Sequence, residues 1–281
     1  MISVDTIMDR LLFKSQISAS PKKLANLAEP VFNQVHDSQI IMHSELPVRY
    51  ADGIGYLKTS NTTPLPMFSK NTLFTNFESE DGHNIGYYTY DVDFSKKEIN
   101  HGYIETLSNQ RHKGIGEILR LSSIMELKEN DLNAIKIEAL SPAVPFHLHY
   151  NFQPDVKDKD TAYKLLCDIA SNNDVAEKYR KEANELRRAL PTEEEEEPDS
   201  VLEALKADFS QGKSKHINLS KSLAKKFNEF ITRFVNAHQN NWDEAKFDFD
   251  RLPMVLTKEK IAKRSDFFNK LFQKHGIDYE V

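Results

Sequence analysis

The hydrophobic pattern changes its period between residues 107 and 116, and this change constrains the fold more than any other feature. Before it, three segments are rich in β-branched and aromatic residues and separated by turn residues: Leu73–Phe77, Ile85–Phe94 and Glu98–Leu107. After it, residues 116–130 place apolar side chains on one broad helical face, and residues 133–140 alternate again as a strand. The order predicts an antiparallel meander followed by a helix and a further strand.

The rest of the chain gives helical signals. Strand patterns stop after Pro154, residues 157–190 have helical periodicity, and the segment Pro191–Ser200 (PTEEEEEPDS) is a charged spacer bracketed by prolines. We therefore expect an α+β domain over residues 1–155, a helical connection over 156–190, an acidic linker over 191–200 and an all-helical C-terminal region over 201–281. Residues 22–35 also have helical spacing, with Pro30 as a break.

A basic, glycine-containing loop stands at the change of period, with the sequence RHKGIG. It follows a strand and begins a helix, where backbone N–H groups lack partners and the helix dipole adds positive potential. Such a loop can hold a phosphate group, although ordinary strand-to-helix turns use glycine as well. The loop consists of Arg111, His112, Lys113, Gly114, Ile115 and Gly116.

This order of elements, with R-x-x-G-x-G before the helix, resembles the GNAT superfamily of N-acetyltransferases. The resemblance covers residues 73–154 well, residues 22–70 loosely and residues 155–281 not at all. It implies a mixed, mostly antiparallel sheet flanked by helices. It also implies that residues 111–116 bind the pyrophosphate of acetyl coenzyme A, which serves as co-substrate without a metal.

A second element of the resemblance follows the strand at residues 133–140. The family pattern A-x-x-F/L-Y-x-x-x-G-F is matched here by AVPFHLHYNF, residues 143–152. Asn151 replaces the usual glycine, and asparagine is the next-best residue for a left-handed helix end. His147 stands where the family has the tyrosine that protonates the departing thiolate, and Leu140 stands where asparagine is common. Tyr150, three residues after His147, is an alternative acid, whereas His149 should point away.

The resemblance also implies direct transfer from the thioester to an amine. Backbone N–H groups near Thr106 and Leu107 would polarise the acetyl carbonyl, and the pantetheine arm would lie between this strand and residues 133–140, which splay apart. A protonated amine needs a base or a water chain. Glu105 and His101 are candidates, and their spacing puts them on one face if the strand is regular. Each of these side chains can equally be a plain surface residue.

Composition excludes several classes of protein. The net charge is −6 and Cys167 is the single cysteine, so neither a wholly basic nucleic-acid-binding surface nor an intrachain disulfide is expected. The sequence has no Cys/His cluster with zinc spacing, no secretory signal and no apolar run long enough to span a membrane. The loop lacks the G-K-[ST] of a nucleotide hydrolase. We expect a cytoplasmic protein, and a bacterial effector exported by a non-classical route would look the same.

Two functional hypotheses remain open at this point. The first is an N-acetyltransferase whose acceptor is a protein lysine, a protein N-terminus or a small amine. The second is a catalytically impaired protein of the same fold, which binds coenzyme A or another protein through its helical C-terminal region. In that region residues 223–238 and 261–275 share a pattern, consistent with a duplicated docking unit or with two unrelated amphipathic helices.

Overall fold

The computed structural model describes residues 30–35, 38–43, 45–60, 72–110, 112–190, 218–238 and 251–281. The acidic segment 191–200 and residues 22–29 thus lie outside the described part. The chain divides into two compact units, one formed by residues 1–138 and 255–281 and the other by residues 139–254. The last residues of the chain therefore belong to the same unit as the meander, whereas the sequence analysis grouped them with a separate helical region.

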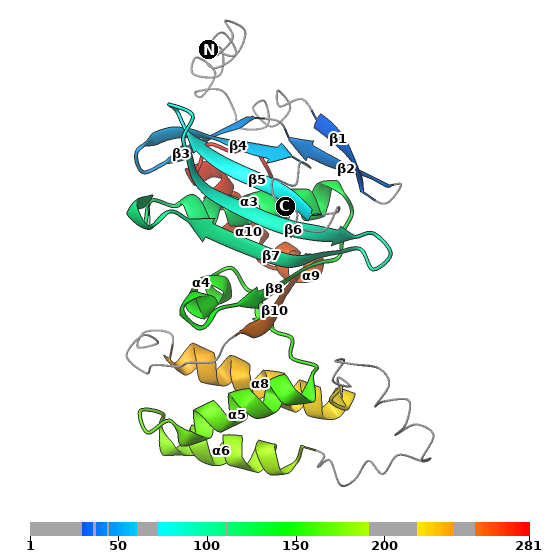
Figure 1. Cartoon of the computed structure of the whole chain (residues 1–281), viewed down its shortest axis with the longest axis vertical. Helices are drawn as coiled ribbons and strands as arrows, with labels where there is room; N and C mark the ends of the chain where they lie inside the picture. The colour runs from blue at the N-terminus through cyan, green and yellow to red at the C-terminus, as the bar shows by residue number, and fades with distance from the viewer. Residues whose placement is uncertain are drawn as a thin grey trace, which may run out of the picture. The chain divides into compact units, whose positions relative to one another are not determined.

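The first unit is built around the predicted meander (Figure 1). The strands β5 (Thr72–Ser79), β6 (Asn84–Asp93) and β7 (Glu98–Thr106) pair antiparallel in sequence order, as predicted. A hairpin of β3 (Leu46–Tyr50) and β4 (Gly53–Ser60) extends the sheet beside β5. The described strand order is β3-β4-β5-β6-β7-β8-β10-β9, with β8 (Ala134–Ala139), β9 (Gln153–Pro154) and β10 (Leu252–Thr257).

Two parts of the chain differ from the secondary structure expected from the sequence. Residues 30–35 form the strand β1 (Pro30–Val35), which pairs with β2 (Ser38–His43), so the expected helix does not continue to Val35. The strand β10 interrupts the C-terminal region that was expected to be entirely helical. Burial alternates along this strand: Leu252, Met254 and Leu256 are buried, and the residues between them are partly exposed. Helix is confirmed in that region for α8 (Lys221–His238), α9 (Lys258–Ala262) and α10 (Ser265–Lys274).

The helix α3 (Ile115–Glu129) packs against β5, β6 and β7 and is buried on nearly all sides. Its apolar residues form the core with Phe77, Tyr88 and Tyr90 of the sheet. The helix also buries three ionisable side chains, Glu117, Arg120 and Glu126. Thr75 donates a hydrogen bond to Glu126 at 3.2 Å, and burial raises the pKa of Glu126 to about 8.

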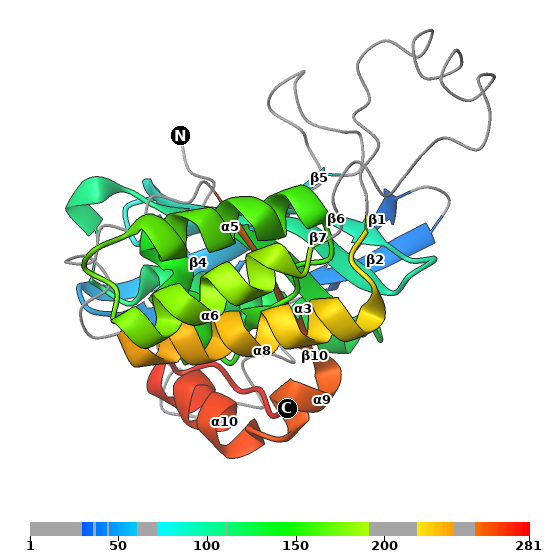
Figure 2. The ribbon, with the colours of Figure 1, turned by 90° about the horizontal axis from the view of Figure 1, so that it is seen from below.

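The second unit is mainly helical. The helices α5 (Lys159–Ser171), α6 (Glu177–Arg188) and α8 lie side by side (Figure 2). Residues 172–176 divide the single helical stretch expected over 157–190. The helix α8 buries Phe227, Phe230 and Phe234, and the ring of Tyr179 in α6 lies 5.6 Å from that of Phe234. The apolar side of α8 is thus used within its own unit.

Candidate active site

A β-bulge interrupts β7 at His101 and Gly102. Thr89 pairs with Tyr103 and Asp91 with Asn100, so two residues of β7 lie opposite Tyr90 alone. His101 has a φ of +55°, a left-handed conformation in which histidine is tolerated better than most residues. The sequence analysis expected His101 and Glu105 on one face only if the strand was regular. Because the bulge interrupts the strand between them, their spacing no longer places them on the same face.

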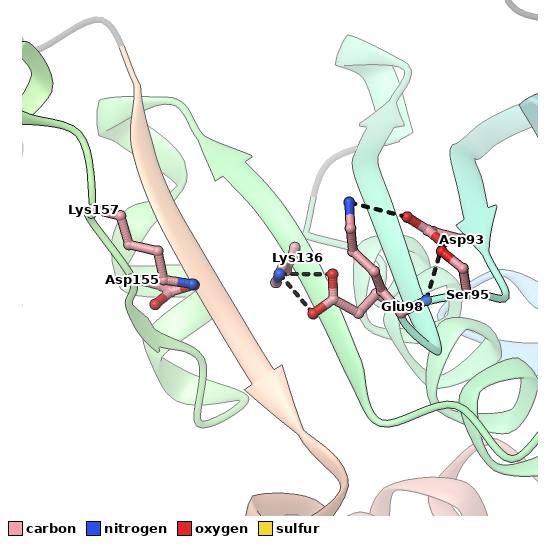
Figure 3. A network of polar contacts seen from close by, with 7 residues as sticks. Asp93, Ser95, Glu98, Lys136, Asp155 and Lys157 are labelled. Carbon is pink, nitrogen blue, oxygen red and sulfur yellow. Dashed lines mark hydrogen bonds and ion pairs between the residues drawn. The ribbon is translucent and has the colours of Figure 1, made fainter. Parts of the chain in front are cut away.

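The bulge comes directly after the point where β7 leaves its parallel neighbour. The pairing of β7 with β8 covers only Glu98 with Ala134 and Ile99 with Ile135. Lys136 and Glu98 form an ion pair of 2.6 Å across this paired end (Figure 3). A bulged strand bends, and β7 and β8 part as expected from the sequence.

Among the described residues, the parting leaves backbone donors of β7 without a strand partner. Leu107 donates its N–H to the carbonyl of Ile85 at 3.2 Å, so this donor is occupied and unavailable for the polarising role expected of it. In an antiparallel ladder hydrogen-bonded and non-hydrogen-bonded pairs alternate. The pairs Thr106–Gly86 and Ile104–Tyr88 are therefore the non-hydrogen-bonded ones. The N–H groups of Ile104 and Thr106 accordingly point away from β6, toward the side on which β8 has parted.

The glycine loop has the backbone geometry of an anion site. A short 3₁₀ turn, η1 (Ser108–Gln110), connects β7 to it, and Gly114 is the N-cap of α3 with a φ of +86°. A left-handed residue followed by right-handed ones turns successive N–H groups toward one point, which suits an anion. The N–H groups of Ile115 and Gly116 stand in the first helical turn, where no intrahelical acceptor exists. The structure thus brings together two donors of the predicted loop.

The basic side chains of the loop differ in their surroundings. Lys113 forms an ion pair with Asp52 in the β3–β4 turn, and its carbonyl accepts a hydrogen bond of 3.2 Å from the N–H of Ala51. His112 is exposed and has a φ of +64°. Arg111 lies outside the described residues. Lys113 therefore anchors the loop to the β3–β4 turn, and the N–H groups of Ile115 and Gly116 are the donors of the loop that could hold an anion.

Residues of the C-terminal segment also lie at the glycine loop, and this was not predicted from the sequence. Glu117 in the first turn of α3 is a buried carboxylate, and its Oε1 lies 2.5 Å from Lys274 Nζ and 2.5 Å from His275 Nε2. His275 Nδ1 lies 2.6 Å from the carbonyl oxygen of Arg49. A Cβ atom added to Gly114 would lie 3.2 Å from His275 Cε1. The side chains of Lys274 and His275 thus both contact the carboxylate of Glu117, next to the glycine loop.

Glu105 is held by two tyrosines on the same face of the sheet. Tyr87, its partner across the ladder, donates a short hydrogen bond to Glu105 Oε2, and Tyr103 donates to the same oxygen at 3.1 Å. Burial raises the pKa of both tyrosines, as does the neighbouring carboxylate. Both hydroxyl groups therefore remain donors at neutral pH.

The second sequence element forms the helix α4 (Val144–His149), preceded by the 3₁₀ turn η2 (Ser141–Ala143), in the other unit. Asn151 has a φ of +67°, which confirms the left-handed helix end. Phe152 N–H donates to His147 O and Asn151 N–H to Leu148 O, the two bonds of a Schellman motif.

Both candidate acids of this element are buried among aromatic rings. The ring centroid of His147 lies 5.5 Å from that of Phe152, and the ring centroid of Tyr150 lies 4.9 Å from that of Phe146. His149 is exposed, as expected.

Across the described ranges, no group of three His, Cys, Asp or Glu side chains could hold a metal ion. Among the helices of the described part, none is long and apolar enough to cross a membrane.

No family model matches the chain, and no curated protein matches it. Solved structures do match part of it. A chimera of the spermidine N-acetyltransferase SpeG from Vibrio cholerae and hSSAT matches with a TM-score of 0.28 and 13% identity, over 32% of this chain and 58% of the chimera. This chain thus spans a little over half the length of that protein.

Two further structures match more of the chain. A nourseothricin acetyltransferase matches with a TM-score of 0.29 and 14% identity, over 56% of this chain and 85% of its own. A putative streptothricin acetyltransferase from Bacillus anthracis str. Ames, in complex with acetyl coenzyme A, matches with a TM-score of 0.29 and 14% identity, over 47% and 73%. All three of these proteins are named as acetyltransferases.

Proposed function

We propose that this chain is an N-acetyltransferase that moves an acetyl group from acetyl coenzyme A to a primary amine. The observation that carries the proposal is the end of β7. There the bulge at His101–Gly102 parts β7 from β8, the N–H groups of Ile104 and Thr106 turn to the parted side, and the same strand leads into the loop at Gly114. A site for a carbonyl oxygen and a site for a phosphate thus follow each other along one stretch of chain.

The residues present fit acetyl coenzyme A, which supplies an activated acetyl thioester when bound. Ile115 and Gly116 would hold the pyrophosphate through their N–H groups, and Lys274 with His275 would offset the charge of Glu117. Thr106 N–H would stabilise the negative charge that develops on the acetyl oxygen. The loop is held in place beforehand by Lys113 and Ala51, so little ordering is needed on binding.

The reaction follows from these roles. The amine nitrogen forms a bond to the acetyl carbon, the bond from that carbon to sulfur breaks, the nitrogen loses one proton and the thiolate gains one. We assign the first proton transfer to Glu105, directly or through water. We assign the second to His147, which stands at the position that the resemblance gives to the acid, with Tyr150 as the alternative.

Incubation with acetyl coenzyme A and a panel of amines, followed by mass spectrometry of the products, tests the proposal. We expect a mass gain of one acetyl group on at least one alkylamine, and a loss of about 10²–10⁴-fold in rate when the true acid is removed by His147→Ala or Tyr150→Phe. Unchanged turnover in both variants would remove our acid assignment. Binding of acetyl coenzyme A without transfer to any amine would favour the catalytically impaired alternative.

The helical regions do not favour the docking alternative. The helix α8 buries its apolar side within its own unit, and α10 buries Phe268 and Phe272 within the unit that carries the glycine loop. A truncation that removes residues 201–281 would also remove His275, so it cannot test docking alone. Substitutions on the exposed side of α8, such as Lys225→Glu, are the suitable probe for a protein partner.

A further inference from the structure

Glu117 occupies a position in α3 at which a carboxylate competes with a bound anion. Gly114 is the N-cap of the helix, so Glu117 is its third residue. A glutamate at this position commonly folds back and accepts a hydrogen bond from the N–H of the N-cap residue, and the helix dipole favours its negative charge there. The N–H groups to which we assign the pyrophosphate, those of Ile115 and Gly116, belong to the same turn. The chain thus carries a group with the charge of the ligand beside its own anion site.

In the structure the carboxylate of Glu117 contacts two residues of the C-terminal segment. Its Oε1 lies 2.5 Å from Lys274 Nζ and 2.5 Å from His275 Nε2. Glu117 and His275 are both buried, so solvent screens their contact little. The Lys274 side chain is 59% exposed, and its contact is therefore the weaker of the two.

His275 is held in a fixed position by its neighbours. The N–H of Arg49 in β3 donates a hydrogen bond of 2.9 Å to the carbonyl of His275, and His275 Nδ1 lies 2.6 Å from the carbonyl oxygen of Arg49. The N–H of His275 donates back into α10, to the carbonyl of Leu271 at 3.1 Å. With its backbone and Nδ1 fixed in this way, the ring presents Nε2 to Glu117 from one place.

We propose that His275, with help from Lys274, is a positioning residue for the cofactor site, because it holds the carboxylate of Glu117 away from the N–H groups at the start of α3. Without this contact, Glu117 turns back to the N-cap and opposes the binding of an anion. The C-terminal segment then controls access of the anion to the glycine loop. The inference rests on the proposed binding of acetyl coenzyme A at this loop and adds an internal competitor to it.

The binding of inorganic pyrophosphate to the full chain tests the inference, measured by isothermal titration calorimetry without acetyl coenzyme A. We expect His275→Ala to weaken binding by about tenfold or more and Lys274→Gln to weaken it by about two- to fivefold. Lys270→Gln makes the same change of charge one turn earlier on the exposed side of α10. It is the matched control and should leave the affinity unchanged.

A double-variant cycle separates positioning from a purely structural role. Glu117→Ala removes the competitor, so this variant should bind pyrophosphate at least as tightly as wild type. In the Glu117→Ala background, His275→Ala should change the affinity by less than about twofold. Glu185→Ala, which removes an exposed carboxylate of α6, should not restore binding to His275→Ala. If His275→Ala does not fold, the same comparison with Lys274→Gln decides the question, and its effect should be smaller in the Glu117→Ala background.

Two outcomes would contradict the account in different ways. Pyrophosphate binding by wild type, with an equal loss on His275→Ala in the presence and absence of Glu117, would overturn this inference alone, because His275 would then act on the fold or on the anion directly. A failure of both wild type and Glu117→Ala to bind pyrophosphate would contradict the anion site of the proposed function and the inference with it.

Discussion

His275 Nε2 lies 2.5 Å from Glu117 Oε1, a contact between the end of the chain and the first turn of α3. With Glu117 ionised, both ring nitrogens of His275 face acceptor oxygens, because Nδ1 lies 2.6 Å from the carbonyl of Arg49. Each ring nitrogen is therefore within hydrogen-bond distance of an oxygen. The last residues of the chain therefore compensate the carboxylate that stands nearest to the proposed phosphate site.

Removing His275 should cost much more stability than removing Lys274. Both side chains contact Glu117 Oε1, but His275 is 3% exposed whereas the Lys274 side chain is 59% exposed. We expect His275→Ala to lower the free energy of unfolding by about 2–3 kcal/mol, because buried acceptors lose their donors. Lys274→Ala should lower it by less than about 1 kcal/mol. Urea unfolding of the two variants measures the difference, and equal losses would contradict the buried contact.

Gly114 and Gly82 provide a matched pair for the glycine loop. Their φ angles are +86° and +85°, but a Cβ atom at Gly82 would contact nothing within 4 Å, whereas one at Gly114 would meet His275 Cε1. Each change to alanine should cost about 1–2 kcal/mol for the left-handed conformation, and Gly114→Ala somewhat more.

The same two variants separate stability from binding. Only Gly114→Ala should reduce the rise in melting temperature that acetyl coenzyme A produces. A reduction of similar size in Gly82→Ala would show that the effect is general destabilisation and not a property of the loop.

The sequence predicted local features of this region well. The strands β5, β6 and β7 and the helix α3 have strong alternation or helical spacing, and Asn151 has a side chain that suits a left-handed helix end. The hairpin of β3 and β4 was missed although Asp52–Gly53 is a turn signal, because only the turn, and not the flanking pattern, is distinctive.

Features that depend on distant contacts could not be predicted. His275 is separated from Glu117 by 158 positions, and no periodicity connects them. The bulge at His101–Gly102 depends on the register of β6 and β7, which alternation alone does not set. The strand β10 is short and contains Pro253, so its pattern is weak until a neighbouring strand pairs with it.

Glu126 should make stability depend on pH. Burial raises its pKa from 4.5 to about 8 in the folded chain. Between these values the folded state holds a proton that the unfolded state lacks, so this contribution is complete below the lower value and is lost as pH rises toward the higher one. The expected slope is at most about 1.4 kcal/mol per pH unit.

The variant Glu126→Gln should lack this part of the pH dependence, measured by urea unfolding from pH 5 to pH 8. Glu129→Gln, on the exposed side of the same helix, should keep it. If wild type and Glu126→Gln have the same pH dependence, Glu126 is ionised in the folded chain.

Asn151 should tolerate glycine better than alanine. Its φ of +67° costs an alanine about 1–2 kcal/mol, whereas glycine adopts it freely. We expect Asn151→Ala to destabilise by about 1 kcal/mol and Asn151→Gly to be neutral or slightly stabilising. The opposite order in denaturant unfolding would contradict the Schellman motif at the end of α4.

The binding of acetyl coenzyme A tests the central claim most directly. Thermal melting with and without saturating acetyl coenzyme A reports binding to the folded chain, since a ligand that binds only the native state raises the midpoint by mass action. The account predicts a higher midpoint for wild type and no change for the double variant Gly114→Asp, Gly116→Asp, which puts carboxylates at the phosphate site. A wild-type midpoint that does not move at saturating acetyl coenzyme A would contradict the account.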